Sequence, residues 1–102
     1  MKEKTGIRVR VPQLRSVEDA VRLYYEKSEL TNADIKQLFD VHSSATIAKL
    51  KNLARERMAE ENVPVWDARN VNTAAAYSVW GLQIDNLEHR LKKLRELREL
   101  TA

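Results

Sequence analysis

The chain contains no cysteine and only two histidines, His42 and His89. Without cysteine it has no disulfides and no thiolate metal sites, and two histidines so far apart in sequence make a poor zinc site. No apolar run approaches the roughly 20 residues that a membrane-spanning helix needs, and the first ten residues lack the apolar core of a signal peptide. We therefore expect no metal, no other cofactor, no membrane partner and a cytoplasmic location.

Glycine and proline are also scarce, with two of each. After Gly6 and Pro12 no helix-breaking residue occurs until Pro64, and Gly81 is the last one. The uninterrupted middle of the chain therefore predicts helices. With 102 residues, of which 43% are hydrophobic and 32% charged, the chain has the composition of one small, soluble, folded domain. The expected fold class is mainly α.

Arrangements that would indicate catalysis are missing too. The sequence shows no carboxylate pair placed for acid–base chemistry, no nucleophile with a base beside it and no glycine-rich phosphate loop. His42 next to Ser43 is adjacency and does not make a catalytic pair. We expect no enzymatic activity and no small-molecule substrate.

Two capped helices are predicted in the first half of the chain. Ser16, with Asp19 three residues later, begins a helix over 17–27. Thr31 and Asp34 form a Thr-x-x-Asp capping box that begins a second helix. The apolar residues that recur at helical spacing after this box are Ile35, Leu38 and Phe39. They should form its buried face.

A third helix is predicted from about Ser44, with two chemically different sides. Its apolar residues fall on one side of a helical wheel, and its small and polar residues fall on the other. The apolar side consists of Ile47, Leu50, Ala54 and Met58. The opposite side consists of Ala45, Lys49, Asn52 and Glu56. One side can anchor the helix in a core while the other stays open to a partner.

The second and third helices, with the turn between them, resemble the helix-turn-helix DNA-binding superfamily. The resemblance covers about a fifth of the chain and rests on Asp34, Ile35, Leu38, Phe39, Asp40, Val41, His42, Ser43, Thr46, Ile47 and Leu50. Asp40 stands where the superfamily usually has glycine, and it tolerates a positive φ better than most residues. The interval from Val41 to Ile47 is one residue longer than the common spacing, which leaves the register of the turn open.

This resemblance implies a set of DNA contacts. Residues at the start and on the exposed side of the third helix would touch bases, with Asn52 suited to adenine and Lys49 to guanine. The full set of base-contacting candidates is His42, Ser43, Ser44, Ala45, Thr46, Lys49 and Asn52. The candidates for phosphate contacts are Lys36, Lys51, Arg55 and Arg57. Each residue also has a structural explanation, such as helix capping by Ser43 or Ser44.

Charge is distributed unevenly along the chain. Residues 1–15 carry five basic residues and one acidic residue, and residues 41–60 carry four and two, whereas residues 16–40 carry three and six. Positive charge thus falls on a basic arm over 1–15 and on the third helix, as a DNA footprint requires. Segments of this size also differ by a few charges without functional cause. Within the arm, Ile7, Val9 and Val11 are typical of an edge strand or an extended segment.

Residues 62–73 are compatible with a small β-wing that completes a domain over 16–81. Val63, Val65 and Val71 suggest two short strands around a turn at 67–70, which resembles the wing of excisionase-like and MerR-like proteins. The resemblance puts Arg69 at the wing tip, near a phosphate. Trp66 is either a packing residue or a groove contact, and burial is the expected outcome. Thr73 should cap a short helix that Gly81 ends.

The last segment, 82–102, is predicted to form a long amphipathic helix that opens at Asp85 and dimerises. Its apolar residues follow a short coiled-coil seam. The seam and its extension consist of Ile84, Leu87, Leu91, Leu94 and Leu97. So many leucines are hard to bury in a small domain, so we expect a homodimer, with packing across the helix-turn-helix as the alternative.

Taken together, the residues predict a protein that binds double-stranded DNA as a homodimer. Suitable roles are a transcriptional regulator or an accessory factor of a phage or mobile element, and RNA binding stays open as well. The alternative is a protein–protein interaction module that uses the leucine-rich C-terminal helix and does not bind DNA.

Overall fold

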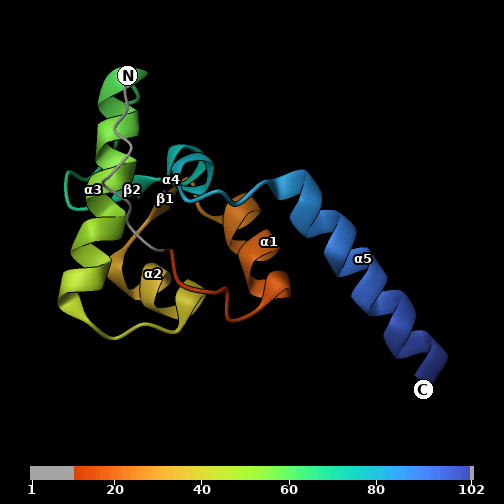
Figure 1. Cartoon of the computed structure of the whole chain (residues 1–102). Helices are drawn as coiled ribbons and strands as arrows, with labels where there is room; N and C mark the ends of the chain where they lie inside the picture. The colour runs from red at the N-terminus through yellow and green to blue at the C-terminus, as the bar shows by residue number, and fades with distance from the viewer. Residues whose placement is uncertain (1–10, 102) are drawn as a thin grey trace, which may run out of the picture.

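The computed structural model describes residues 11–101, with the side chain of Thr101 left out. Within this range the helices are α1 (Val17–Glu26), α2 (Asn32–Phe39), α3 (Ser44–Glu60), α4 (Thr73–Val79) and α5 (Ile84–Thr101). Two short strands, β1 (Glu29–Leu30) and β2 (Val71–Asn72), complete the fold, which Figure 1 shows. The mainly α class is therefore confirmed. Ile7 and the rest of the first ten residues of the predicted arm lie outside the described part.

Local capping chemistry determines where the first helices begin. Ser16 accepts a hydrogen bond from the Asp19 backbone N–H at the start of α1. At the start of α2, Thr31 Oγ1 accepts from the Asp34 N–H while Asp34 Oδ2 accepts from the Thr31 N–H, which is a reciprocal capping box. After α2 the chain turns at Asp40, whose φ is 54°. All three features agree with the sequence-based predictions.

The small sheet differs from the predicted hairpin. Of the two strands expected within 62–73, only β2 forms, and its antiparallel partner is β1, with Leu30 opposite Val71. Both of these side chains are fully buried, so the pairing takes two apolar groups into the core at once. Val63 and Val65 instead pack against the core from an irregular loop. A hairpin within the loop would have left Leu30 without this strand partner.

Strand β2 leads directly into α4. Asn72 caps this helix by accepting a hydrogen bond from the Ala75 N–H at 2.9 Å, so Thr73, the predicted cap, is its first helical residue. Gly81 follows the helix with a φ of 77°, as expected for a left-handed position. Asn72 thus determines where α4 begins, and Gly81 turns the chain after the helix ends.

Helix α4 ties the outer helices together. The Tyr77 hydroxyl donates to the Ala20 carbonyl of α1 at 2.7 Å, and Trp80 Nε1 donates to the Leu50 carbonyl of α3 at 2.9 Å. The Trp80 ring also meets Phe39 of α2 edge to face, with ring centroids 5.4 Å apart. Burial raises the pKa of Tyr77 above its usual value, so the hydroxyl stays a donor. Helices α1, α2 and α3 therefore meet on one short segment.

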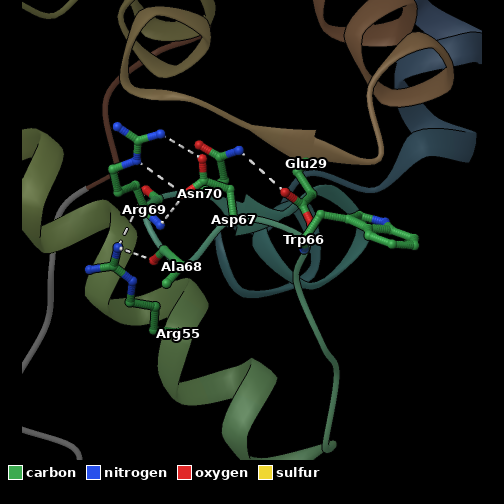
Figure 2. Close-up of polar contacts among 7 residues, drawn as sticks. All are labelled: Glu29, Arg55, Trp66, Asp67, Ala68, Arg69 and Asn70. Carbon is green, nitrogen blue, oxygen red and sulfur yellow. Dashed lines mark hydrogen bonds and ion pairs between the residues drawn. The ribbon is translucent and has the colours of Figure 1, made fainter.

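Trp66 is exposed, contrary to the expectation that it is buried. Its exposed fraction is 94%, whereas that of Trp80 is 3%. The physical reason is that the loop around Trp66 is held by polar contacts at its base, and the indole points outward from them (Figure 2). Trp80 instead follows Ala76 and Tyr77 at helical spacing, on the buried side of α4.

Helix α5 begins at Ile84, one residue before the predicted start, and packs along α1 for only part of its length. Tyr25 donates to Glu88 at 2.9 Å and Arg95 lies 3.9 Å from Glu18, so the two helices run antiparallel. The end of α5 extends away from the rest of the fold (Figure 1). None of the helices described within 11–101 has both the length and the apolar character that crossing a bilayer requires.

Candidate nucleic-acid interface

Helix α3 has the two sides that its sequence predicts. Ile47, Leu50, Ala54 and Met58 are buried, and their exposed fractions do not exceed 7%. Ser43 caps the helix by accepting from the Thr46 N–H at 3.3 Å. The Ser43 hydroxyl is therefore engaged in a structural role, and Thr46 beside it is only half exposed. The cap determines where α3 begins, and the buried apolar side anchors the helix in the core.

The opposite side of α3 is open to solvent. Ala45, Lys49 and Asn52 are exposed there, about half a turn of the helical wheel away from the buried residues. Among the described residues, the Lys49 and Asn52 side chains make no hydrogen bond and no ion pair with the protein. His42 is also exposed and lies 3.7 Å from Asp40 across the turn. The Lys49 and Asn52 side chains are therefore available to an external partner.

A shallow depression of about 200 Å³ lies along one flank of α3, where it meets α2. Its polar lining comes from both helices and consists of Asn32, Lys36, Ser44, Lys51, Asn52 and Arg55. Lys51 Nζ donates to Asn32 Oδ1 at 2.9 Å, which fixes the ammonium group between the helices. Burial, followed by the nearby Arg55 charge, lowers the pKa of Lys51. Three cations therefore converge with no acidic side chain in the depression.

Asn32 was missed by the sequence analysis. It directly follows the predicted cap Thr31, a position at which a polar residue can stay exposed while the helix begins. Its amide oxygen accepts from Lys51, and the packing of α2 against α3 places Asn32 in the lining of the depression. The signal in the sequence was the capping box; the pairing with Lys51 was not visible.

Arg55 and Arg57 serve different structural purposes. Arg55 Nη2 donates to the Ala68 and Arg69 carbonyls at 3.2 and 3.4 Å, which ties the loop before β2 to α3. Arg57 Nη1 donates to Ser78 Oγ of α4 at 2.9 Å and also lies near Glu60 and Glu61. Residues two positions apart in a helix point in directions that differ by about 200°. The structure therefore separates Arg57 from the other predicted phosphate contacts.

The loop at residues 66–70 is held in place from several sides, as Figure 2 shows. Glu29 of β1 accepts from the Trp66 backbone N–H and from Asn70 Nδ2. Asp67 accepts from the Arg69 backbone N–H at 2.9 Å and from its guanidinium at 2.8 and 3.1 Å. Arg69 is exposed and sits on the side of the loop that contacts Arg55, whereas Trp66 points away from both (Figure 2). The loop thus places the Arg69 backbone beside the basic flank of α3, which consists of Lys36, Lys51 and Arg55.

The Asp67 carboxyl is expected to titrate at about pH 2, below its usual value of 3.8. The side-chain hydrogen bond from Arg69 lowers the pKa of Asp67 most, followed by the bond from the Arg69 backbone. Because the charged carboxylate makes these bonds, the contact is complete above the usual pKa and is lost as the pH falls through about 2. A carbon-detected NMR titration measures this midpoint. In Arg69→Ala the midpoint should rise, and an unchanged midpoint would contradict the assignment.

The chemistry of this surface is that of recognition through hydrogen bonds and charge. Within residues 11–101 no group of three or more histidine, aspartate or glutamate side chains is arranged to hold a metal ion. Comparison with known proteins finds no matching family model, no similar curated protein and no similar solved structure.

Proposed function

We propose that this protein binds double-stranded DNA by inserting α3 into the major groove. The observation that carries the proposal is an α3 side with unengaged Lys49 and Asn52, on a helix whose other side is anchored in the core. A major groove admits one α-helix, and asparagine and lysine are donors that distinguish adenine and guanine there. Seventeen residues make α3 about 25 Å long, enough to lie along several base pairs.

The basic flank supports the same orientation. Lys36, Lys51 and Arg55 line one edge of α3. The Arg69 backbone carbonyl lies beside them and accepts from Arg55, while the Arg69 guanidinium is paired with Asp67. With α3 in the groove, this edge meets the sugar–phosphate backbone, where cations contribute affinity and fix the register. Arg57 contacts α4 and is not part of the proposed surface. An A-form RNA duplex has a major groove too narrow for a helix, so the proposal is specific to DNA.

Gel-shift experiments on pooled genomic fragments test the proposal. We expect retention at low salt that falls steeply between about 50 and 200 mM salt, because bound cations displace counterions from phosphates. Lys36→Ala should weaken binding to all fragments and reduce the salt slope by about 1. Lys92→Ala, on α5, is the matched control and should leave binding unchanged. Absence of retention at low salt, or equal losses in both variants, would reject the proposal.

The biological role follows from the target, which a selection from random DNA would identify. A site near a promoter favours a transcriptional regulator, and a site within a phage or mobile element favours an accessory factor. Both roles agree with the cytoplasmic location expected from the sequence. No catalytic step is part of the proposal.

The homodimer expected from the leucine spacing stays a prediction. Of the five residues assigned to it, Leu87 and Leu91 are buried within one chain, with exposed fractions of 4% and 7%, and Ile84 is half-buried. The assigned residues that are exposed on a single chain are Leu94 and Leu97, with Leu100 beyond them. Stable interfaces bury about 800 Å² on each partner, so a homodimer would need further contacts beside these leucines. Analytical ultracentrifugation measures the oligomeric state directly.

A further inference from the structure

A groove far from α3, between residues 12–18 and α5, has a volume of about 650 Å³. Its apolar lining comes from three segments of the chain and consists of Leu14, Val17, Leu82, Leu87, Leu91 and Leu94. Within this lining Leu87 and Leu91 are buried, whereas Leu94 is 42% exposed. Leu97 and Leu100 lie farther along α5, outside the lining, and are 57% and 84% exposed. Exposed leucines beside an apolar groove indicate a surface that a partner covers.

The edges of this groove are basic. Arg15 lies on one side, Arg90 and Arg98 lie on the other, and the acidic residue in the lining is Glu18. Glu18 already faces a cation, because Arg95 lies 3.9 Å from its carboxylate. Among residues 11–101 the side chains of Arg15 and Arg90 form no ion pair. The groove therefore offers an apolar floor with positive edges.

These features together identify the chemistry of the occupant. We infer that the groove binds an amphipathic helix of another protein, with apolar residues at helical spacing on one side and aspartate or glutamate along its edges. Such a helix places its apolar side on the leucine floor and its carboxylates beside the arginines. From Leu87 to Arg98 the groove extends about 16 Å along α5, which is the length of about three helical turns.

A second copy of this chain fits the groove less well. A second α5 laid antiparallel brings Arg90 of each copy towards Arg98 of the other, and a parallel one brings identical arginines together. Like charges held opposite one another oppose association. Duplex DNA has no apolar surface to cover the leucine floor. Charge complementarity therefore favours an acidic helix, and this inference does not depend on DNA binding by α3.

The test uses the full chain and a fluorescein-labelled designed peptide of about three turns, with leucine at helical spacing and glutamate on both edges. Two matched peptides serve as controls: one carries lysine in place of glutamate, and the other has the same composition without helical spacing. Fluorescence anisotropy should show saturable binding of the glutamate peptide alone. Binding should weaken with added salt, because the ion pairs lie at the exposed edges of the groove.

Two charge reversals on α5 locate the binding site. Arg90→Glu, at the edge of the groove, should weaken binding of the glutamate peptide at least tenfold. Lys92→Glu makes the same kind of change on the other side of α5 and should alter binding less than twofold. Circular dichroism confirms that both variants fold, and Leu94→Glu should also abolish binding.

Several results would overturn the inference. These are no saturable binding, equal binding of the lysine peptide, or equal effects of the two charge reversals. A chain that sediments as a dimer, and that Leu94→Glu converts to a monomer, would assign the groove to a second copy and also overturn it. Gel shifts with the Arg90→Glu variant separate the two proposals. This variant should retain DNA as the original chain does, whether or not it binds the peptide.

Discussion

Replacing Trp80 by alanine is expected to lower the free energy of unfolding by about 3–5 kcal/mol. The side chain is 3% exposed, packs against Phe39 and donates to the Leu50 carbonyl, so the substitution removes contacts with α2 and α3 together. Urea denaturation followed by circular dichroism measures the loss. Because a chain of this size is only about 5–15 kcal/mol stable, the variant is compared with Trp80→Phe. Phenylalanine keeps a six-membered aromatic ring but loses the N–H-bearing ring of the indole and its hydrogen bond. That variant should lose about 1–2 kcal/mol.

Trp66→Ala is the matched control for this experiment. Its side chain is 94% exposed, so the free energy of unfolding should change by no more than about 0.5 kcal/mol. The contact from Glu29 at this position is to the backbone N–H and survives the substitution. In Trp80→Phe the remaining indole is exposed, so its fluorescence should be red-shifted already in the folded state. Equal losses for the two tryptophans would contradict the assignment of Trp80 to the core.

The second large effect is expected in DNA discrimination. Replacing Lys49 and Asn52 together by alanine should reduce the preference for the selected DNA site over random DNA by at least about tenfold. Each base contact of this type is worth about 1–3 kcal/mol. Both side chains are exposed and unengaged within the described structure, so the variant should unfold at the same urea concentration as the original chain. Competition gel shifts give the ratio of the two affinities.

Glu56→Ala provides the control for this second experiment. Glu56 lies on the same exposed side of α3, and its removal takes away a negative charge near the proposed DNA surface. Affinity for DNA should therefore stay the same or rise, with discrimination retained. If the double alanine variant keeps its discrimination, bases are read by other residues and the orientation of α3 must be revised.

The sequence predicted features that depend on residues a few positions apart. The caps at Ser16 and Thr31, the turn at Asp40 and the two sides of α3 were all predicted, because each depends on hydrogen bonds or spacing within about four residues. Helical spacing also separates Arg55 from Arg57. The sequence therefore already indicates that these two arginines lie on different sides of α3.

Tertiary packing determined everything that depends on segments distant in the chain. Whether β2 pairs with its neighbouring loop or with β1 depends on two buried side chains separated by about 40 residues of sequence. Which tryptophan is buried depends on whether a neighbouring helix covers it. The same holds for α5, where Leu87 and Leu91 are buried against the rest of the fold while Leu94 and Leu97 remain exposed. The residue type shows that a side chain is apolar, and local spacing shows on which side of a helix it lies. Only the three-dimensional arrangement of the helices decides what covers it.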